Sequence, residues 1–196
     1  MDFYFDFASP YAYFASGQVD AIAARHGRQV AWRPFMLGQA FAQTGMRPAT
    51  EPPLRGDYVR HDLARTARRL GLPFVLPEGF PMFALAPSRV YYWLLDRDAA
   101  LAKEFAIGVF DGYFGQGRNM ADVEAVADVA AGLGVARDVA GAAAGDPAIK
   151  ARFKAETDAA LAKGAFGSPY FIVDGEPFWG ADRLDQIDQW LETGGW

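Results

Sequence analysis

A serine followed by a proline stands where the first predicted strand gives way to the first predicted helix. Ser9 fits the N-cap of that helix and Pro10 fits its first turn. The unpaired N–H groups and the dipole of a helix N-terminus favour an anion, and a hydroxyl there can donate a hydrogen bond to a thiolate. The chain contains no cysteine. Disulfide chemistry by the protein itself is therefore excluded, and any thiol at Ser9 must come from a small molecule.

An ordinary N-cap explains the same serine, with a contribution of about 1 kcal/mol to the helix. The setting of Ser9 lacks the G-x-S-x-G pattern of a hydrolase nucleophile. No spacing of His, Asp or Glu predicts a metal site. These observations leave thiol binding and helix capping as the two interpretations of Ser9.

Two turns near the C-terminus could bind a peptide-like ligand. Pro169 precedes a predicted strand and is a candidate cis proline, which would turn the backbone of Ser168 towards the first helix. That backbone could then pair with an extended ligand, as an added strand does. A trans proline at the start of an edge strand explains the same residues. Asp182 precedes the last predicted helix, where it could hold an amino group or serve only as an N-cap.

The predicted elements follow a βαβ, helical block, ββα order. Hydrophobic patterning predicts strands at residues 2–7, 29–35, 170–173 and 177–179, with Asp174-Gly175 as a hairpin turn. It predicts helices at residues 10–25, 55–70, 83–95, 99–113, 121–133, 136–144, 146–163 and 183–192. Residues 38–53 are rich in Gly, Pro, Thr and Gln and are predicted to be irregular.

This order is typical of an α/β protein with a thioredoxin-like βαβ…ββα domain that is split by an all-helical insertion. We expect the thioredoxin-like domain at residues 1–38 and 164–196, and the helical insertion at residues 39–163. A length of 196 residues suits one domain with an insertion.

The composition limits the partners and the location. Hydrophobic residues make up 52% of the chain, which is enough for a large core, and the net charge of -5 does not favour nucleic acid. No signal peptide is visible, and no apolar run is long enough for a membrane span. The lack of cysteine agrees with a reducing compartment. We therefore expect a cytoplasmic protein that binds neither nucleic acid nor a membrane.

Three groups of residues carry a resemblance to a known family. They are Asp6-Phe7-Ala8-Ser9-Pro10-Tyr11, Gly167-Ser168-Pro169 and residues 178–184. In their order and spacing they resemble the 2-hydroxychromene-2-carboxylate isomerase family. That family is close to the kappa-class glutathione transferases and, more remotely, to the DsbA-like oxidoreductases. The likeness extends over nearly the whole chain and implies a DsbA- or kappa-class-like fold, a glutathione cofactor and a homodimer.

The resemblance also implies a set of cofactor-binding residues. Ser9 would hydrogen-bond the sulfur of glutathione as the catalytic residue, and the backbone at Ser168-Pro169 would pair with the cysteinyl part. Asp182 would hold the γ-glutamyl ammonium. Arg55 matches a position where the kappa class uses a lysine near the glycyl end. The full predicted site is Ser9, Tyr11, Arg55, Ser168, Pro169, Ala181, Asp182 and Arg183.

The chain departs from its relatives at three positions. Met46 and Phe83 stand where the family often has polar residues, and Ala181 lacks a hydroxyl that is often found beside the aspartate. These differences predict a more apolar pocket.

The resemblance implies an enzyme that interconverts 2-hydroxychromene-2-carboxylate and trans-o-hydroxybenzylidenepyruvate with glutathione, in the catabolism of aromatic compounds. A kappa-like glutathione transferase or peroxidase that acts on other electrophiles is one alternative. A glutathione- or peptide-binding module without catalysis is another. Turnover distinguishes the module from the enzymes, and the range of electrophiles distinguishes the two enzymes.

Overall fold

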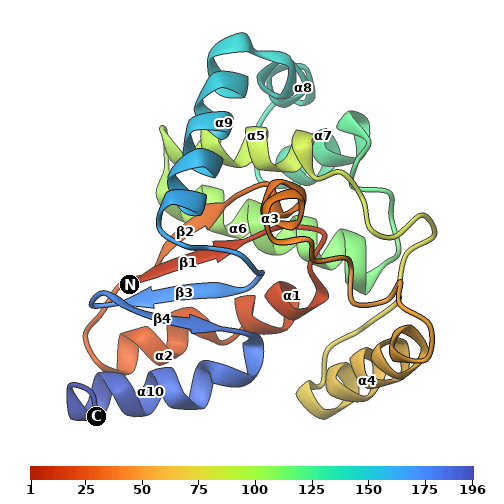
Figure 1. Ribbon diagram of the computed structural model, residues 1–196. Coiled ribbons are helices and arrows are strands. Elements are labelled where there is room, and N and C mark those ends of the chain that lie inside the picture. Colours follow the sequence, from red (N-terminus) through yellow and green to blue (C-terminus); the bar gives the residue numbers. More distant parts are fainter.

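A mixed sheet of four strands lies at the centre of the protein, in the order β2-β1-β3-β4 (Figure 1). The computed structural model describes all residues from Met1 to Trp196. The elements are β1 (Asp2–Phe5), α1 (Pro10–Ser16), α2 (Val19–Arg25), β2 (Ala31–Pro34), α3 (Leu37–Thr44), α4 (Arg55–Leu70), α5 (Leu85–Leu95), α6 (Ala99–Phe110), the π-helix η1 (Asp111–Gly115), α7 (Val123–Gly132), α8 (Arg137–Gly145), α9 (Pro147–Ala162), β3 (Tyr170–Val173), β4 (Glu176–Trp179), the 3-10 helix η2 (Ala181–Arg183) and α10 (Leu184–Thr193). No helix combines the length and the apolar character that a bilayer crossing requires.

The predicted βαβ and ββα units are both present. β1 is parallel to β2, while β3 is antiparallel to β1 and to β4. Asp174 and Gly175 both have a positive φ, as a tight hairpin turn requires. The helix predicted at residues 55–70 and the strand predicted at residues 170–173 have those bounds, and the other elements that were predicted correctly differ at their ends by a few residues.

Two sequence predictions were wrong. The helix expected at residues 10–25 is broken into α1 and α2 at Gly17, where a flexible residue ends the first helix. The segment expected to be irregular contains α3, which ends at Gly45 in the left-handed conformation. The Gly and Pro residues of this segment are typical of turns and led to the prediction of an irregular segment. The eight residues of α3 are nevertheless mostly good helix formers.

Strand β1 contributes to two hydrophobic clusters, one on each face. Phe3 and Phe5 have no exposed surface, and their rings pack against Trp32 in the main core. Tyr4 lies on the other face and packs edge-on against Phe35 in a smaller cluster. Alternate side chains of a strand point to opposite faces, so β1 has a buried residue on each side and lies deep in the protein.

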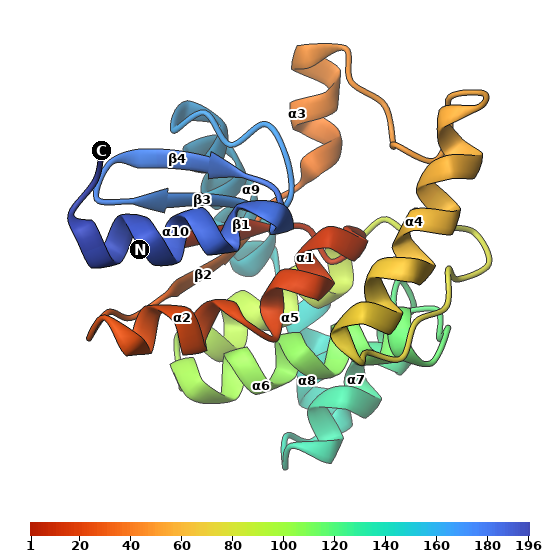
Figure 2. The same ribbon diagram turned by 90° about the horizontal axis from the view of Figure 1, so that it is seen from below.

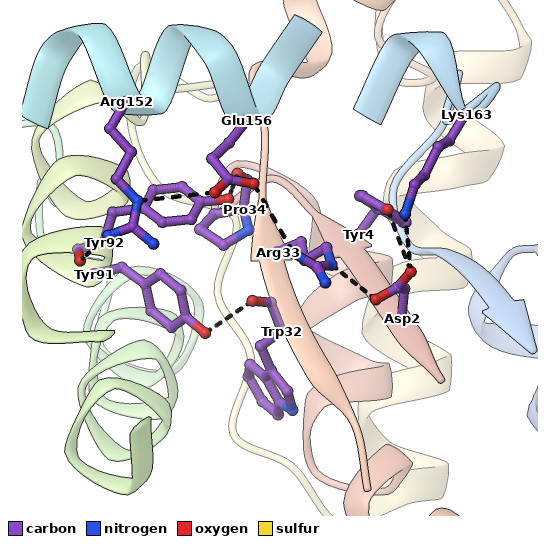
Figure 3. A network of polar contacts seen from close by, with 10 residues as sticks. All are labelled: Asp2, Tyr4, Trp32, Arg33, Pro34, Tyr91, Tyr92, Arg152, Glu156 and Lys163. Carbon is purple, nitrogen blue, oxygen red and sulfur yellow. Dashed lines mark hydrogen bonds and ion pairs between the residues drawn. The ribbon is translucent and has the colours of Figure 1, made fainter. Parts of the chain in front are cut away.

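The outer edge of the sheet at β2 is covered by α5 and its tyrosines (Figure 3). The hydroxyl of Tyr91 donates to the carbonyl of Trp32 at 2.9 Å, and that of Tyr92 donates to the carbonyl of Pro34 at 2.7 Å. Both hydroxyl contacts are buried. An exposed strand edge offers unpaired backbone groups to other chains, so these two bonds satisfy the edge and anchor the helical block to the sheet.

Helix α9 is tied to the same side of the sheet by a chain of ion pairs (Figure 3). Arg33 of β2 contacts Asp2 at 2.7 Å and Glu156 of α9 at 3.9 Å. These side chains are partly exposed, so each pair adds little free energy. Their contribution is to fix the orientation of α9 relative to β1 and β2.

We predict that Tyr92→Phe lowers the free energy of unfolding by about 1–3 kcal/mol, because it leaves the buried carbonyl of Pro34 without a donor. Urea unfolding measures the change. Tyr58→Phe is the matched control, since that ring is largely exposed and its hydroxyl contacts only Arg65. Equal losses in the two variants would contradict the anchoring role of Tyr92.

Candidate functional site

Four loops meet at one end of the strands because of the directions in which the strands run. The parallel pair β1 and β2 ends at Phe5 and Pro34, which are paired. The antiparallel strand β3 begins at Tyr170, which is paired with both Tyr4 and Trp179, the last residue of β4. The loops that follow β1, β2 and β4 and the loop that precedes β3 therefore share one end of the sheet.

Ser9 joins two of these loops. It is the N-cap of α1, and its Oγ accepts a hydrogen bond from the N–H of Ala12 at 3.2 Å. The same hydroxyl donates to the carbonyl oxygen of Ser168 at 2.7 Å. The Ser168-Pro169 bond is cis, and β3 lies between β1 and β4, so Pro169 does not begin an edge strand. The cis loop thus lies against the N-terminus of α1.

Backbone groups around Ser9 remain available to a ligand. The N–H groups of Tyr11 and Ser168 have no hydrogen-bond partner in the protein. The carbonyl oxygen of Ser168 accepts one bond, from Ser9, and keeps a second lone pair. A donor and an acceptor of one residue, beside a helix N-terminus, can pair with the backbone of an extended anionic ligand.

A buried carboxylate lies beneath these loops. Asp6 Oδ1 accepts the N–H of Ala8 at 2.8 Å, and Oδ2 accepts the N–H of Leu37 at 2.9 Å. The N–H of Asp6 itself donates to Ser168 Oγ at 2.8 Å. Burial raises the pKa of Asp6 to about 6, and the two backbone hydrogen bonds oppose this rise. Asp6 therefore connects the loops after β1 and β2 with the loop before β3.

The loops open into a cavity of about 1240 Å³ that α3 and α4 enclose on two sides. In Figure 2 these two helices stand apart, and α1 lies below α3 and to the left of α4. Seven of the eight predicted site residues line this cavity: Ser9, Tyr11, Arg55, Ser168, Ala181, Asp182 and Arg183. Pro169 is not in its lining. The other two departures, Met46 and Phe83, line it as Ala181 does, together with Met36, Phe41 and Met82.

Charged side chains surround Tyr11 at one side of the cavity. Burial raises the pKa of Tyr11, the carboxylates of Asp62 and Asp182 raise it further, and the guanidinium of Arg55 opposes them. One cation, Arg55, and two anions, Asp62 and Asp182, thus line the cavity with Tyr11. This arrangement suits a ligand that carries both an ammonium and a carboxylate.

Asp182 does not cap the last helix, contrary to the second interpretation offered for it. The short 3-10 helix η2 precedes α10, whose N-cap is Arg183, and no side chain bonds the N-terminal N–H groups. The side chain of Asp182 is 73% exposed and forms one ion pair, with Arg183 at 3.3 Å. Because this carboxylate caps no helix, it can bind a ligand.

Several lining residues were not predicted from the sequence. Phe41 belongs to α3, which was not predicted, and Asp62 lies on α4 outside every motif that was singled out in the sequence. Asp6 was quoted only within a motif, although an acid between two aromatic residues of a strand is a signal for a buried polar role. Trp179 packs over Gly167, where a Cβ would lie 2.1 Å from the indole Nε1.

A family model described as a DSBA-like thioredoxin domain matches residues 1–192 of the chain. The chain belongs to this DSBA-like thioredoxin domain family. The match confirms the thioredoxin-like α/β fold class that the order of the elements predicts.

Three known proteins resemble the chain along nearly its whole length. The 2-hydroxychromene-2-carboxylate isomerase of Sphingobium xenophagum is 27% identical over 195 residues, with 97% of each chain covered. Glutathione S-transferase kappa 2 of Caenorhabditis elegans is 28% identical over 207 residues, with 96% of this chain and 90% of that protein covered. The solved structure of a 2-hydroxychromene-2-carboxylate isomerase superposes with a TM-score of 0.88 at 26% identity, covering 97% of this chain and 93% of that chain. These relatives confirm the resemblance stated from the motifs.

We predict that Asp182→Ala changes the free energy of unfolding by less than about 0.5 kcal/mol, because the side chain is exposed and caps no helix. The matched variant is Asp146→Ala, since Asp146 caps α9 through Ala148 and Ile149. That variant is expected to lose about 1 kcal/mol. Denaturant unfolding compares the two variants. A loss of unfolding free energy in Asp182→Ala as large as in Asp146→Ala would contradict the conclusion that Asp182 caps no helix.

Proposed function

We propose that the protein is a glutathione-dependent isomerase that interconverts 2-hydroxychromene-2-carboxylate and trans-o-hydroxybenzylidenepyruvate. One observation carries the proposal: a helix N-terminus with a serine hydroxyl and the free N–H of a cis-proline loop face one cavity, in a chain without cysteine. The relatives named as this isomerase and as a kappa-class glutathione transferase support it.

The residues of the cavity fit glutathione. The backbone of Ser168 offers an N–H and a carbonyl lone pair to the cysteinyl backbone. Asp182 offers a carboxylate to the γ-glutamyl ammonium, and Arg55 offers a guanidinium to a carboxylate. Bound glutathione would supply the thiol nucleophile that the chain lacks.

Ser9 and the first turn of α1 would hold the sulfur as an anion. The hydroxyl of Ser9 has one hydrogen, which it directs to Ser168 in the free protein and which it can direct to a thiolate instead. The free N–H of Tyr11 and the helix dipole add to this stabilisation. Each of these groups lowers the pKa of a thiol, and a thiolate is the reactive form.

The rest of the cavity would hold the second substrate. Met36, Phe41, Met82 and Phe83 give it an apolar surface that suits the aromatic ring of a chromene carboxylate. Methionine side chains adapt their shape to different ligands, and Met46 extends this surface. The apolar cavity is therefore open to aromatic substrates of more than one shape.

A kappa-like glutathione transferase is the second candidate, favoured by the same adaptable surface and by Phe83, which is 83% exposed at the cavity. A panel of electrophiles distinguishes the two activities. Turnover of the chromene carboxylate with little conjugation of halogenated aromatic compounds is expected for the isomerase. Broad conjugation without isomerisation would assign the transferase activity.

Ser9→Ala is predicted to weaken glutathione binding by about 10- to 100-fold, because a charge-assisted hydrogen bond to sulfur is lost. Glutathione-dependent turnover should fall at least as far, while the fold persists with a loss of about 2–4 kcal/mol, from the helix cap and from the buried carbonyl of Ser168 that loses its donor. Calorimetric titration and a chromene carboxylate assay measure these effects. Ser16→Ala is the matched control, because Ser16 is buried in the same helix and bonds only the carbonyl of Tyr13. Undiminished binding and turnover in Ser9→Ala would refute the role assigned to Ser9.

A further inference from the structure

We propose that Asp6 is a positioning residue whose ionised carboxylate holds the first turn of α1 and the start of α3 in the arrangement that shapes the cavity around Ser9. The inference rests on the proposed function for its ligand, and on the geometry of the loops for its mechanism. Asp6 lies three residues before Ser9, at the end of β1, and is 7% exposed.

Three segments far apart in the sequence meet at Asp6. Its carboxylate oxygens hold Ala8, beside Ser9, and Leu37, the first residue of α3. Its N–H holds the hydroxyl of Ser168, whose carbonyl accepts the bond from Ser9. The groups that would contact glutathione and the helix that forms one wall of the cavity are thus tied to one side chain.

The ionised carboxylate makes both side-chain bonds most strongly. Each oxygen accepts one backbone N–H, and in the ionised form both oxygens share the negative charge. In a protonated carboxyl one of the two oxygens becomes a hydroxyl, which is a weaker acceptor, and the NH2 group of an asparagine accepts no hydrogen bond at all. One bond is then weakened or lost, and either the turn before Ser9 or the start of α3 is held less firmly.

The surroundings of Asp6 contain no counter-ion. No lysine, arginine or histidine shifts the pKa of Asp6. Apart from burial, only the N–H groups of Ala8 and Leu37 shift it. Ser168 faces it from the cis loop with a neutral hydroxyl. Tyr113 of η1 is the one titratable neighbour: burial raises its pKa to about 12, the bond from Met82 opposes this, and Asp6 adds to it. Tyr113 stays neutral in the range where Asp6 titrates.

Burial raises the pKa of Asp6, so the ionised carboxylate is lost at a pH that can be tested. Because the desolvated carboxylate has a pKa of about 6, it is ionised above that pH and protonated below it. The loops around the cavity should therefore change their arrangement as the pH falls through this value, because one of the two bonds is weakened while the surrounding fold stays intact. Phe41 and Ala42 of α3 would lose their fixed position, and so would Ser9.

The pH dependence of S-methylglutathione binding tests the proposal. This thioether has no thiol to ionise, so any dependence between about pH 5 and pH 7.5 belongs to the protein. For the wild type we expect the association constant to fall about tenfold as the pH is lowered, since restoring the arrangement that binds the ligand then costs about the free energy of one hydrogen bond. Asp6→Asn should bind weakly over the whole range, with a flat profile.

Two control variants separate Asp6 from other titrating groups. Asp2→Asn removes a carboxylate from the same strand; burial opposes ionisation of Asp2, but the hydrogen bond and charge of Arg33 outweigh it and lower its pKa. The double variant His26→Gln/His61→Gln removes both histidines of the chain. Both controls should keep the profile of the wild type. A profile that disappears with the histidines, or that persists in Asp6→Asn, would overturn the proposal.

A measurement on the wild type without ligand keeps the test independent of the variant and of the proposed function. The amide resonances of Ala8 and Leu37 should titrate together near pH 6 in ¹⁵N–¹H spectra. If S-methylglutathione binds no form of the protein, the proposed function fails, and this joint titration alone supports the positioning role. Amides that do not titrate together would overturn that role whatever the ligand does.

Discussion

A carboxylate without a counter-ion lies at the point where the loops of the cavity meet, and the arrangement of those loops depends on it. Burial raises the pKa of Asp6 from 3.8 to about 6, a difference that corresponds to ~3 kcal/mol between the two protonation states. Because the folded pKa lies above the unfolded one, ionised Asp6 destabilises the fold. Protonated Asp6 stabilises the fold at low pH. This contribution to the free energy of unfolding decreases as the pH rises from 3.8 to about 6, and it stays constant above that window. Retention of such a charge is consistent with a role in the site, because burial alone would favour an apolar residue.

The directions of the strands explain why so few residues can control the site. The ends of β1 and β2 and the start of β3 lie together, so Asp6, Leu37 and Ser168 come within hydrogen-bond reach across the sheet. The tyrosines of α5 cover the β2 edge on the other side and bond its carbonyls. One set of contacts therefore anchors the helical block, and another shapes the cavity. These two sets use different residues, so stability and binding can vary separately.

The sequence predicted the βαβ and ββα units because their signals are local. Ser9 with Pro10, and the turn at Asp174, each depend on the preferences of a few neighbouring residues. It did not predict α3, whose helix formers lie among turn residues, or the bonds of Asp6, whose partners lie up to 162 residues away. Asp182 was ambiguous because its type fits an N-cap, and only the interposed 3-10 helix shows that it caps nothing. Features that depend on neighbouring residues could therefore be predicted from the sequence, whereas contacts between residues far apart in the chain could not.

The hydrogen bond between Ser9 and Ser168 bears on what the cavity would select. The hydroxyl of Ser9 has one hydrogen, so a bond to sulfur takes it from the carbonyl of Ser168, which is buried and would lose its donor. A simple thiol has no donor that could replace the one lost by this carbonyl. A thiol within a peptide brings a backbone N–H that can replace the lost donor, and a carbonyl that can accept the free N–H of Ser168. The exchange is then balanced in hydrogen bonds, and the charges of Asp182 and Arg55 add to it. If the site binds a thiol as proposed, it should therefore favour a thiol carried by a charged peptide over an equally reactive thiol without one.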